Sequence, residues 1–443
     1  MGHTRKEFFI MPKRTTRVPH ILMPKPGTDL SKWAVIACDQ FTSQPEYWEK
    51  LDKSVDGAPS TLRITLPEVY LEEPDVGDRI QTIHGAMEQY LSDGVLEELP
   101  AGMVLTSRDT GGTCDRKGLV LAFDLEDYDY RLGSTSAIRP TEKTVEERIP
   151  PRLAVREGAA VELPHIMLLI DDPECSVIEP LFAETEKLQK LYDVDLMENG
   201  GHLTGWFLPE GELTEKVEAG LARLADRAVF NAKYGVDDSK PVLPFAVGDG
   251  NHSMATAKAS WEKIKAGLSP EEQENHPARY VLAEVVNLHD KSLEIEGIYR
   301  VLFGVDADDV LSAAQAFFAT HGSEAITADE ALADGQSFPF ETADRKGFLN
   351  VKNSKWALPV ATLQAFLDDY LAAHPVVKID YIHGLDVLHN LSVQPGNMGF
   401  SLPDPAKEDL FRGVIFDGVL PRKTFSMGEA REKRYYMEAK RIL

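Results

Sequence analysis

The sequence predicts an α/β or α+β protein whose core is built around residues 241–259. Short apolar runs of strand length, such as 166–170 and 280–286, alternate with stretches in which apolar residues recur at helical spacing. The 443 residues, 43% of them hydrophobic, provide enough apolar surface for two or three domains with buried cores. No apolar run approaches the length of a membrane-spanning helix.

The expected elements follow the chain in order. Residues 32–37 indicate a strand, and residues 80–91 a helix that ends at Gly94, where the chain needs a left-handed residue. Thr214 is expected to cap a long helix. The other expected elements are strands at 103–108, 117–123, 164–170 and 376–381, helices at 178–191, 308–320, 361–374 and 406–417, and hairpins over 280–295 and 346–356.

Residues 241–259, PVLPFAVGDGNHSMATAKA, combine a strand, a turn and a helix start. Apolar residues over 242–247 predict the strand, Gly248 to Gly250 break it, and the helix is expected from Ser253 onward. A helix that begins after a glycine turn offers free backbone N–H groups and the positive end of its dipole, which favour a phosphate. Asp249 would repel that anion unless it is protonated, holds Mg²⁺ or takes a proton during a reaction. The turn therefore indicates chemistry on a phosphate more than storage of an anion.

The same composition also fits an ordinary turn. Gly-Asp-Gly-Asn is common where an Asp or Asn side chain caps the following helix. A single histidine near a helix start, such as His252, is often a structural hydrogen-bond donor. Composition alone leaves both interpretations open.

A charged segment at 138–156 contains Arg139, Glu142 and Lys143. One interpretation is a solvated helix with surface ion pairs, which is what most such segments are. The other is a clamp in which arginine and lysine bind phosphate while glutamate holds a metal or a proton. Periodicity does not choose between them.

A second basic segment, residues 420–425, lies near the carboxyl end and contains Arg422 and Lys423. It is either a surface tail or a loop that folds back and adds one of these cations to an anion site. Both interpretations stay open.

Charge and cysteine content narrow the class of protein. With 72 acidic and 47 basic side chains the formal net charge is −25, which opposes binding to nucleic acids and anionic membranes. Three cysteines are too few and too far apart for a zinc site or a disulfide framework, so a reduced cytoplasmic setting is expected. The apolar piece at 8–11 is shorter than a signal-peptide core.

P-loop, dinucleotide-binding, G-x-S-x-G and protein-kinase motifs are missing, which argues against the common nucleotide-binding folds.

The order of motifs resembles the domain-of-unknown-function family 1015. The resemblance rests on ACDQF at 37–41 with Tyr47-Trp48, IRPTEKT at 138–144, DGNHS at 249–253, DYIH at 380–383 and PRKT at 421–424. These motifs cover nearly the whole chain. The fold implied is an amino-terminal α/β region over 1–130, a ParB-like core over 131–305 and a carboxyl-terminal α/β cap over 306–443.

The central turn is similar to the signature of the ParB and sulfiredoxin superfamily, which includes DNA-partition proteins, a cysteine-dependent reductase and kinases of free serine. This sequence has Asn251 where the family usually has histidine, and Ser253 where it usually has arginine. The arginine is a phosphate ligand that Lys258, Arg139 or Lys423 would have to replace. A turn without cysteine lacks the reductase's nucleophile, and the negative charge opposes DNA binding. The branch that fits is the small-molecule kinases.

The resemblance thus implies phosphoryl transfer to a small hydroxylated metabolite, with free L-serine as the leading acceptor, ATP, ADP or pyrophosphate as donor, and Mg²⁺ as cofactor. Such transfer needs cations around the phosphoryl group and a carboxylate near the acceptor hydroxyl. The alternative is a non-catalytic module that binds a nucleotide or phosphorylated metabolite and regulates a partner. The expected roles are catalytic for Asp249, His252 and Glu142, phosphate-binding for Gly250, Asn251, Ser253, Arg139, Lys143, Arg422 and Lys423, and metal-binding for Asp249.

Overall fold

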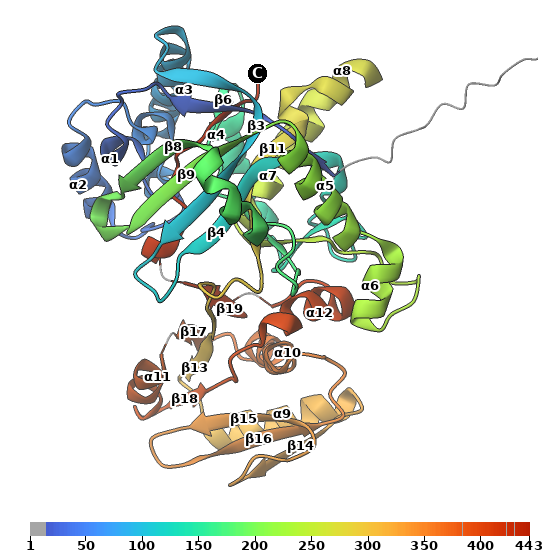
Figure 1. The fold of residues 1–443 in the computed structure, drawn as a ribbon. Helices are drawn as coiled ribbons and strands as arrows, with labels where there is room; N and C mark the ends of the chain where they lie inside the picture. Colours follow the sequence, from blue (N-terminus) through green and yellow to red (C-terminus); the bar gives the residue numbers. More distant parts are fainter. Residues whose placement is uncertain (1–14, 383, 422, 429) are drawn as a thin grey trace, which may run out of the picture.

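The computed structural model describes residues 15–382, 384–421, 423–428 and 430–443. Helices and strands are mixed throughout, and the chain forms two lobes (Figure 1). The larger lobe is built on residues up to about 290 and on the carboxyl-terminal segment, and the sheet of the smaller lobe on residues from about 299 to 400. The expected α/β class is confirmed.

Ten of the described strands form one mixed sheet in the larger lobe. Its order is β5-β10-β7-β11-β4-β3-β9-β8, with β1 beside β4 and β2 beside β3. The regions expected at 1–130 and 131–305 share this sheet, because β4 pairs with β11. The strands are β1 (Thr16–Arg17), β2 (His20–Pro24), β3 (Leu96–Asp109), β4 (Arg116–Asp124), β5 (Ile138–Pro140), β7 (Met167–Ile170), β8 (Gln189–Asp195), β9 (His202–Pro209), β10 (Phe245–Asp249) and β11 (Tyr280–Asn287).

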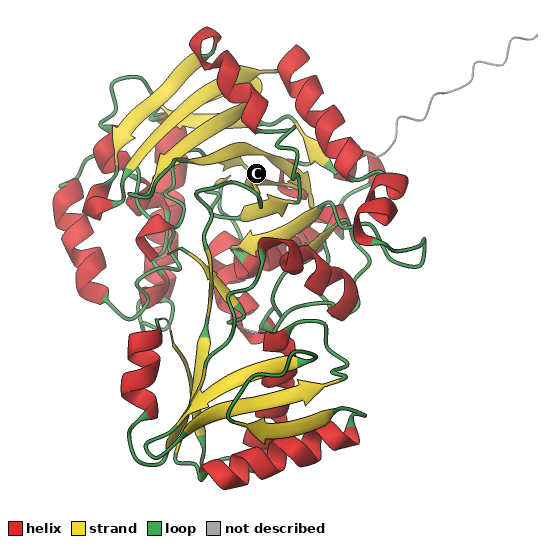
Figure 2. Ribbon diagram, turned by 60° about the horizontal axis from the view of Figure 1, so that its bottom comes forward, coloured by secondary structure: helices red, strands yellow, loops and turns green. Residues whose placement is uncertain are grey.

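Helices surround this sheet (Figures 1 and 2). Several of these helices are amphipathic and bury apolar side chains on one face; in α3, for example, Ile83 and Met87 are buried. The expected end of that helix at Gly94 is confirmed, with φ +65° at the glycine. The helices are α1 (Leu30–Trp33), α2 (Pro45–Val55), α3 (Val76–Ser92), α4 (Ile149–Arg156), α5 (Glu212–Leu224), α6 (Arg227–Tyr234), α7 (Asn251–Lys265) and α8 (Pro270–Asn275).

The smaller lobe is a second sheet with helices packed on it (Figure 2). Its strand order in the described structure is β14-β16-β15-β18-β13-β17. A second apolar core, with Phe318, Phe338 and Phe366 among its buried residues, holds this sheet and its helices together and extends to Leu169 and Ala246 of the larger sheet. The elements are β13 (Tyr299–Phe303), α9 (Ala307–Thr320), β14 (Glu324–Ala328), β15 (Gln336–Glu341), β16 (Lys346–Lys352), α10 (Pro359–Ala373), β17 (Lys378–Ile382), α11 (Leu385–Ser392) and β18 (Asn397–Phe400).

After α12 (Lys407–Asp417), the chain returns from the smaller lobe to the larger one. β19 (Phe425–Met427) pairs with β12 (Ile295–Gly297), and β20 (Lys440–Arg441) pairs with β6 (Val161–Glu162). The return segment passes the end of β10, where a Cβ on Gly248 would lie 2.8 Å from the Met427 methyl carbon. The return segment therefore borders the glycine turn at Met427.

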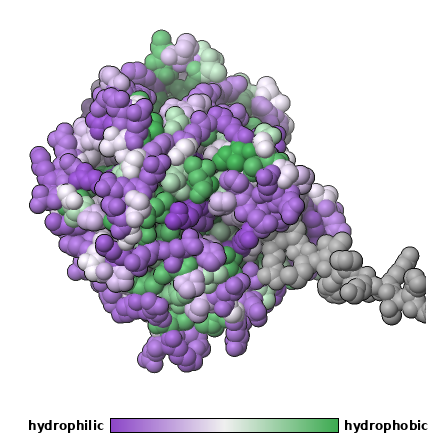
Figure 3. Space-filling model, turned by 90° about the horizontal axis from the view of Figure 1, so that it is seen from above, coloured by the Kyte–Doolittle hydropathy of each residue, from purple (hydrophilic) through white to green (hydrophobic). Residues whose placement is uncertain are grey.

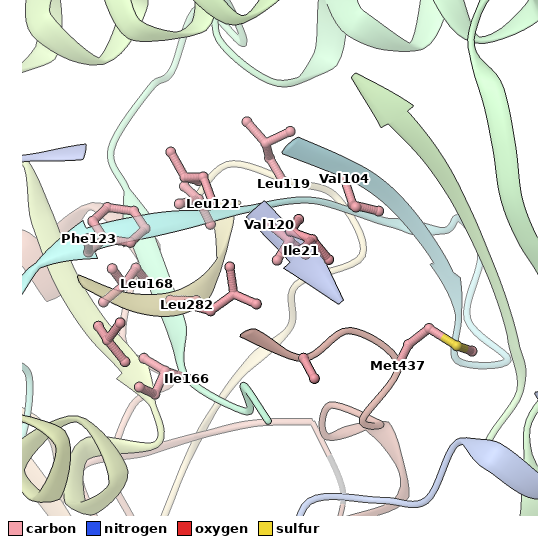
Figure 4. Close-up of a cluster of buried hydrophobic side chains, with 14 of the residues drawn as sticks. Ile21, Val104, Leu119, Val120, Leu121, Phe123, Ile166, Leu168, Leu282 and Met437 are labelled. Carbon is pink, nitrogen blue, oxygen red and sulfur yellow. The ribbon is translucent and has the colours of Figure 1, made fainter. Parts of the chain in front are cut away.

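The core of the larger lobe lies between the sheet and its covering elements. Figure 4 shows Ile21, Leu119, Leu168 and Leu282, from four strands of the sheet, close to Met437 of the return segment. Removing such side chains from water is the main force that holds the layers together. The carboxyl-terminal segment is thus part of this core.

The strand, turn and helix expected over 241–259 are confirmed, with α7 starting two residues earlier than expected. Other expectations were wrong. The hairpin expected over 346–356 lies instead over 336–352, where β15 pairs with β16. Residues 32–37 are not a strand, because Asp29 accepts a hydrogen bond from the Ser31 N–H and starts α1. Residues 178–191 form a 3₁₀ helix over Glu179–Lys187 and then enter β8, since pairing with β9 overrides helical propensity.

The hairpin expected over 280–295 is also absent from the structure. β11 pairs with β4 and β7, and β12 pairs with β19. An apolar run in the sequence identifies a strand but does not identify the strands that pair with it. The packing of distant segments decides that pairing.

The face of the molecule in Figure 3 is mainly hydrophilic, with scattered apolar patches. Among the helices described, none is both long and apolar enough to cross a bilayer.

Candidate active site at the glycine turn

The turn between β10 and α7 is built on two glycines that no larger residue can replace without movement. Gly250 has φ +76°, and a Cβ on it would lie 3.0 Å from Cα of Ile166. A Cβ on Gly248 would lie 2.8 Å from Cγ of Leu169. The first intrahelical bond of α7 runs from the Met254 N–H to the Gly250 carbonyl at 2.9 Å. The preceding amides therefore lie at the positive end of the helix, where an anion is favoured.

Asp249 stands at the end of β10 and faces a cation that the sequence analysis missed. Its Oδ1 accepts the Gly250 N–H at 2.9 Å, and its Oδ2 lies 3.3 Å from Nζ of Lys433. The same Nζ donates to the carbonyl of Met427 at 3.1 Å. No spacing in the sequence links Lys433 to the turn, because only the return of the chain to the larger lobe brings them together.

Glu142 lies beside the return segment. Thr141 donates its hydroxyl to the carbonyl of Val247 at 2.7 Å, and its own carbonyl accepts the Leu420 N–H at 2.7 Å. Burial raises the pKa of Glu142 to about 7, and the charge of Asp249 adds to this rise. The charge of Lys423 and the backbone N–H of Thr424 lower the pKa and oppose the rise. A carboxyl group that titrates near neutral pH can hold or release a proton during a reaction.

Segment 420–425 folds back against the strand that carries Glu142. The buried guanidinium of Arg300 donates to the carbonyl of Lys423 at 2.9 Å, and Lys423 has φ +57° with an exposed side chain. The charge of this exposed lysine acts on Glu142 and lowers the pKa of its carboxyl group. Arg422 lies outside the described residues.

His252 and Asn251 occupy the first turn of α7. Nε2 of His252 accepts the Val145 N–H at 3.3 Å, which ties the helix to the 138–156 segment. Oδ1 of Asn251 is buried without a hydrogen-bond partner in the described structure. A buried acceptor without a donor lowers the stability of the folded protein, unless a ligand or water donates a hydrogen bond to it.

The guanidinium of Arg139 points away from the turn. The guanidinium of Arg139 is buried and donates to the carbonyl of Pro241 at 3.0 Å, ahead of β10, whereas the turn follows the end of β10. Lys143 is exposed next to Glu142. Lys258 pairs with Glu262 at 2.7 Å. The cations close to the turn are instead Lys433 and Lys423.

Ser253 makes a contact that the sequence did not suggest. Its hydroxyl lies 2.6 Å from Nε2 of His165, whose Nδ1 lies 2.7 Å from the hydroxyl of Tyr436. Oδ2 of Asp39 lies 3.8 Å from the same Nε2. Three distant segments therefore converge on the first turn of α7.

The described residues include no group of three or more His, Cys, Asp or Glu side chains arranged to hold a metal ion. Mg²⁺ is commonly bound through one or two carboxylates together with substrate phosphates. Asp249, next to the helix start that favours phosphate, fits that donor set.

The fold is that of an α/β protein. At the boundary of its larger lobe, the turn presents the amino end of α7, which favours an anion. The chain belongs to the family described as "Protein of unknown function (DUF1015)", which matches residues 21–387. The family resemblance seen in the motifs is confirmed. Among curated proteins, none matches this chain.

Several solved structures are similar to the chain. Free serine kinase in complex with AMP has 12% identity and a TM-score of 0.38, with 72% of this chain and 90% of that chain covered. A conserved hypothetical protein from Pyrococcus furiosus has 13% identity and a TM-score of 0.35, with 73% and 94% covered. SbnI from Staphylococcus aureus has 10% identity and a TM-score of 0.33, with 67% and 82% covered.

Proposed function

We propose that the protein is a phosphotransferase that moves a phosphoryl group from ATP, ADP or pyrophosphate to a small hydroxylated metabolite. The observation that carries this proposal is the meeting of the α7 amino end with two carboxylates, Asp249 and Glu142, and two lysines, Lys433 and Lys423. Phosphoryl transfer is mostly positioning and neutralisation of charge, for which this set of groups is suited.

Each group has a role in the proposal. The backbone N–H groups of residues 250–253 bind the transferred phosphate, while Lys433 and Lys423 neutralise its charge. Asp249 would hold Mg²⁺ or orient the acceptor hydroxyl. Mg²⁺ bound to the donor phosphates supplies the remaining charge neutralisation that this class of reaction needs.

Glu142 is the candidate base. Its pKa of about 7 lets it accept the proton of the acceptor hydroxyl near neutral pH. His252, fixed by the Val145 N–H, would position the phosphate from the other side of the turn. Arg139 keeps at most a long-range role, because its guanidinium donates to the Pro241 carbonyl. Lys143, which is exposed and follows Glu142 in the chain, would add positive charge to the site.

Free L-serine is the first acceptor to test, because the resemblance of the turn to the free serine kinases implies it. The experiment is phosphorus NMR on the purified protein with Mg²⁺ and L-serine, with ATP, ADP and pyrophosphate in separate samples. A phosphoserine signal in one sample supports the proposal and identifies the donor. No phosphoester in any sample, with serine or with a panel of other small alcohols, would contradict it.

The contact between Lys433 and Asp249 favours one alternative, a regulatory module that binds a nucleotide or phosphorylated metabolite without turnover. In this structure Lys433 already forms an ion pair with Asp249, the carboxylate that catalysis requires. A donor that raises the melting temperature but is never consumed would support this alternative.

A further inference from the structure

Beyond phosphoryl transfer, the geometry points to a second reactive centre: we propose that Ser253 is a nucleophile, activated by His165, for small neutral esters whose apolar acyl group enters the adjoining cavity. Nothing in the proposed phosphotransferase reaction uses the His165 imidazole or this cavity.

The proposal assigns the ring proton of His165 to Nδ1. Nδ1 lies 2.7 Å from the Tyr436 hydroxyl, which also accepts the Cys38 N–H at 3.1 Å. With Nδ1 donating to that hydroxyl, Nε2 is the basic nitrogen, and it lies 2.6 Å from the Ser253 hydroxyl. A nucleophile, a base and a group that orients the base are therefore in line.

Charge around the pair favours the reaction. The Asp39 carboxylate, 3.8 Å from Nε2, stabilises the imidazolium that forms when Ser253 gives up its proton. Ser253 is also the third residue of α7, so that the positive end of the helix lies close to the oxygen that becomes negative in an acyl-transfer transition state.

A cavity of about 150 Å³ adjoins the Ser253 and His165 side chains. A dry apolar cavity of about this volume holds a benzene-sized group. The wall is mainly apolar and comes from α3, α4, β11 and the segments before β7, with Ile64, Leu66, Met87, Val155, Leu163 and Leu282 among its residues.

The polar groups of the cavity wall argue for a neutral ligand. Arg152 already pairs with Glu68, and Arg156 with Glu162, so neither cation is available to a carboxylate or phosphate. Burial raises the pKa of the Cys38 thiol well above its ordinary value, which keeps this other potential nucleophile protonated. The reactive atom facing the cavity is thus the Ser253 oxygen.

The chemistry balances with water as the only co-reactant. Oγ of Ser253 forms a bond to the ester carbonyl carbon while its proton moves to Nε2 of His165. The bond from that carbon to the alkoxy oxygen breaks, and the leaving alkoxide takes the proton from Nε2. Water then attacks the acyl-serine through the same base, which releases the acid and restores the Ser253 hydroxyl.

The probe is phenylmethanesulfonyl fluoride, which carries a benzene-sized group on a sulfur that reacts with activated serines. The protein is treated without Mg²⁺ or nucleotide, so that failure of phosphoryl transfer has no bearing on the result. We expect one adduct, located on Ser253 by peptide mass spectrometry. Methanesulfonyl fluoride, which leaves the cavity empty, should react more slowly relative to its intrinsic reactivity, by about tenfold or more.

Variants separate activation from simple accessibility. His165→Gln should abolish labelling, whereas Thr256→Val, on the same face of α7 and also lining the cavity, should label like the wild-type protein. Val155→Phe should slow the phenyl reagent and spare the methyl reagent. No adduct on the wild-type protein, an adduct elsewhere, or labelling of Ser253 that does not depend on the phenyl group would overturn the proposal, whether or not the His165 variant folds.

Discussion

Nζ of Lys433 lies 3.3 Å from Oδ2 of Asp249, although 183 residues separate the two in the sequence. The contact joins the glycine turn of the larger lobe to the segment that returns from the smaller lobe. The same segment brings Lys423 to Glu142. The charged groups of the candidate site are therefore assembled by the return of the chain and not by the turn alone.

Replacing Asp249 by Asn is expected to abolish phosphoryl transfer and leave the fold intact. The amide keeps the shape of the side chain but can neither hold Mg²⁺ nor orient the acceptor by charge. Its pair with Lys433 is partly exposed, so stability should change by about 1 kcal/mol or less. Turnover by phosphorus NMR and melting temperature measure the two effects.

Asp129→Asn is the matched control for this variant. Asp129 pairs with Arg131 at 2.8 Å and is exposed to a similar degree as Asp249. This variant should turn over like the wild-type protein. Normal activity in Asp249→Asn would remove Asp249 from the mechanism.

Glu142 should make stability depend on pH in a direction opposite to that of most carboxylates. Burial raises its folded-state pKa from the ordinary 4.5 to about 7, so between these values the folded protein binds more protons than the unfolded chain. Stability contributed by this group is therefore complete below about pH 4.5 and is lost as pH rises to about 7. The loss amounts to at most about 3 kcal/mol.

Glu142→Gln removes this titration. The variant and the wild-type protein should be about equally stable at pH 4, and the variant should be the more stable at pH 8. Urea unfolding at both pH values measures the difference. An equal difference at the two pH values would show that Glu142 does not titrate between them.

Gly250→Ala is expected to damage donor binding and to destabilise the fold. The left-handed φ of +76° costs a non-glycine residue roughly 1–2 kcal/mol, and a Cβ 3.0 Å from the Ile166 backbone forces the turn to shift. A shifted turn moves the N–H groups that bind phosphate. Gly235→Ala, with φ +66° and open space around the new methyl group, isolates the backbone cost. Equal donor affinity in the two variants would show that the Gly250 turn does not bind the donor.

The sequence was sufficient to predict what is local. Apolar residues over 242–247 and the glycines that follow specify strand, turn and helix within one short stretch, and the structure has all three. The helix that ends at Gly94 is another such case, because periodicity and a left-handed glycine are both visible in the sequence.

Contacts between distant segments could not be predicted in this way. Lys433 and His165 reach the turn from different parts of the chain, and neither carries a local motif. Arg139 shows the converse: its charge made it a candidate, yet the parallel pairing of β5 with β10 directs its guanidinium toward Pro241. Charge in a sequence identifies candidates, but sheet register decides where they point.

The carboxyl-terminal segment should be essential for stability because of Arg434. This buried guanidinium lies 2.7 Å from Glu284 and 2.5 Å from Glu438, and it donates to the carbonyl of Pro164 at 2.8 Å. Burial alone would raise the pKa of Glu284, but the charges of Arg434 and Arg116 outweigh it and lower the pKa. Arg434→Met would leave two buried carboxylates without this cation, at an expected cost of about 3–5 kcal/mol.

The cost should depend on pH. In the wild-type protein the lowered pKa of Glu284 means that stability is lost as pH falls. In Arg434→Met the Glu284 carboxylate loses its main cation, its pKa rises, and protonation at low pH relieves the unpaired charge. The difference between the two proteins should therefore be larger at pH 8 than at pH 5 in urea unfolding. Arg63→Met, which breaks the exposed pair with Asp52, is the control and should lower stability by at most about 1 kcal/mol at either pH. A similarly small and pH-independent loss of stability in Arg434→Met would contradict the stabilising role of the buried cluster.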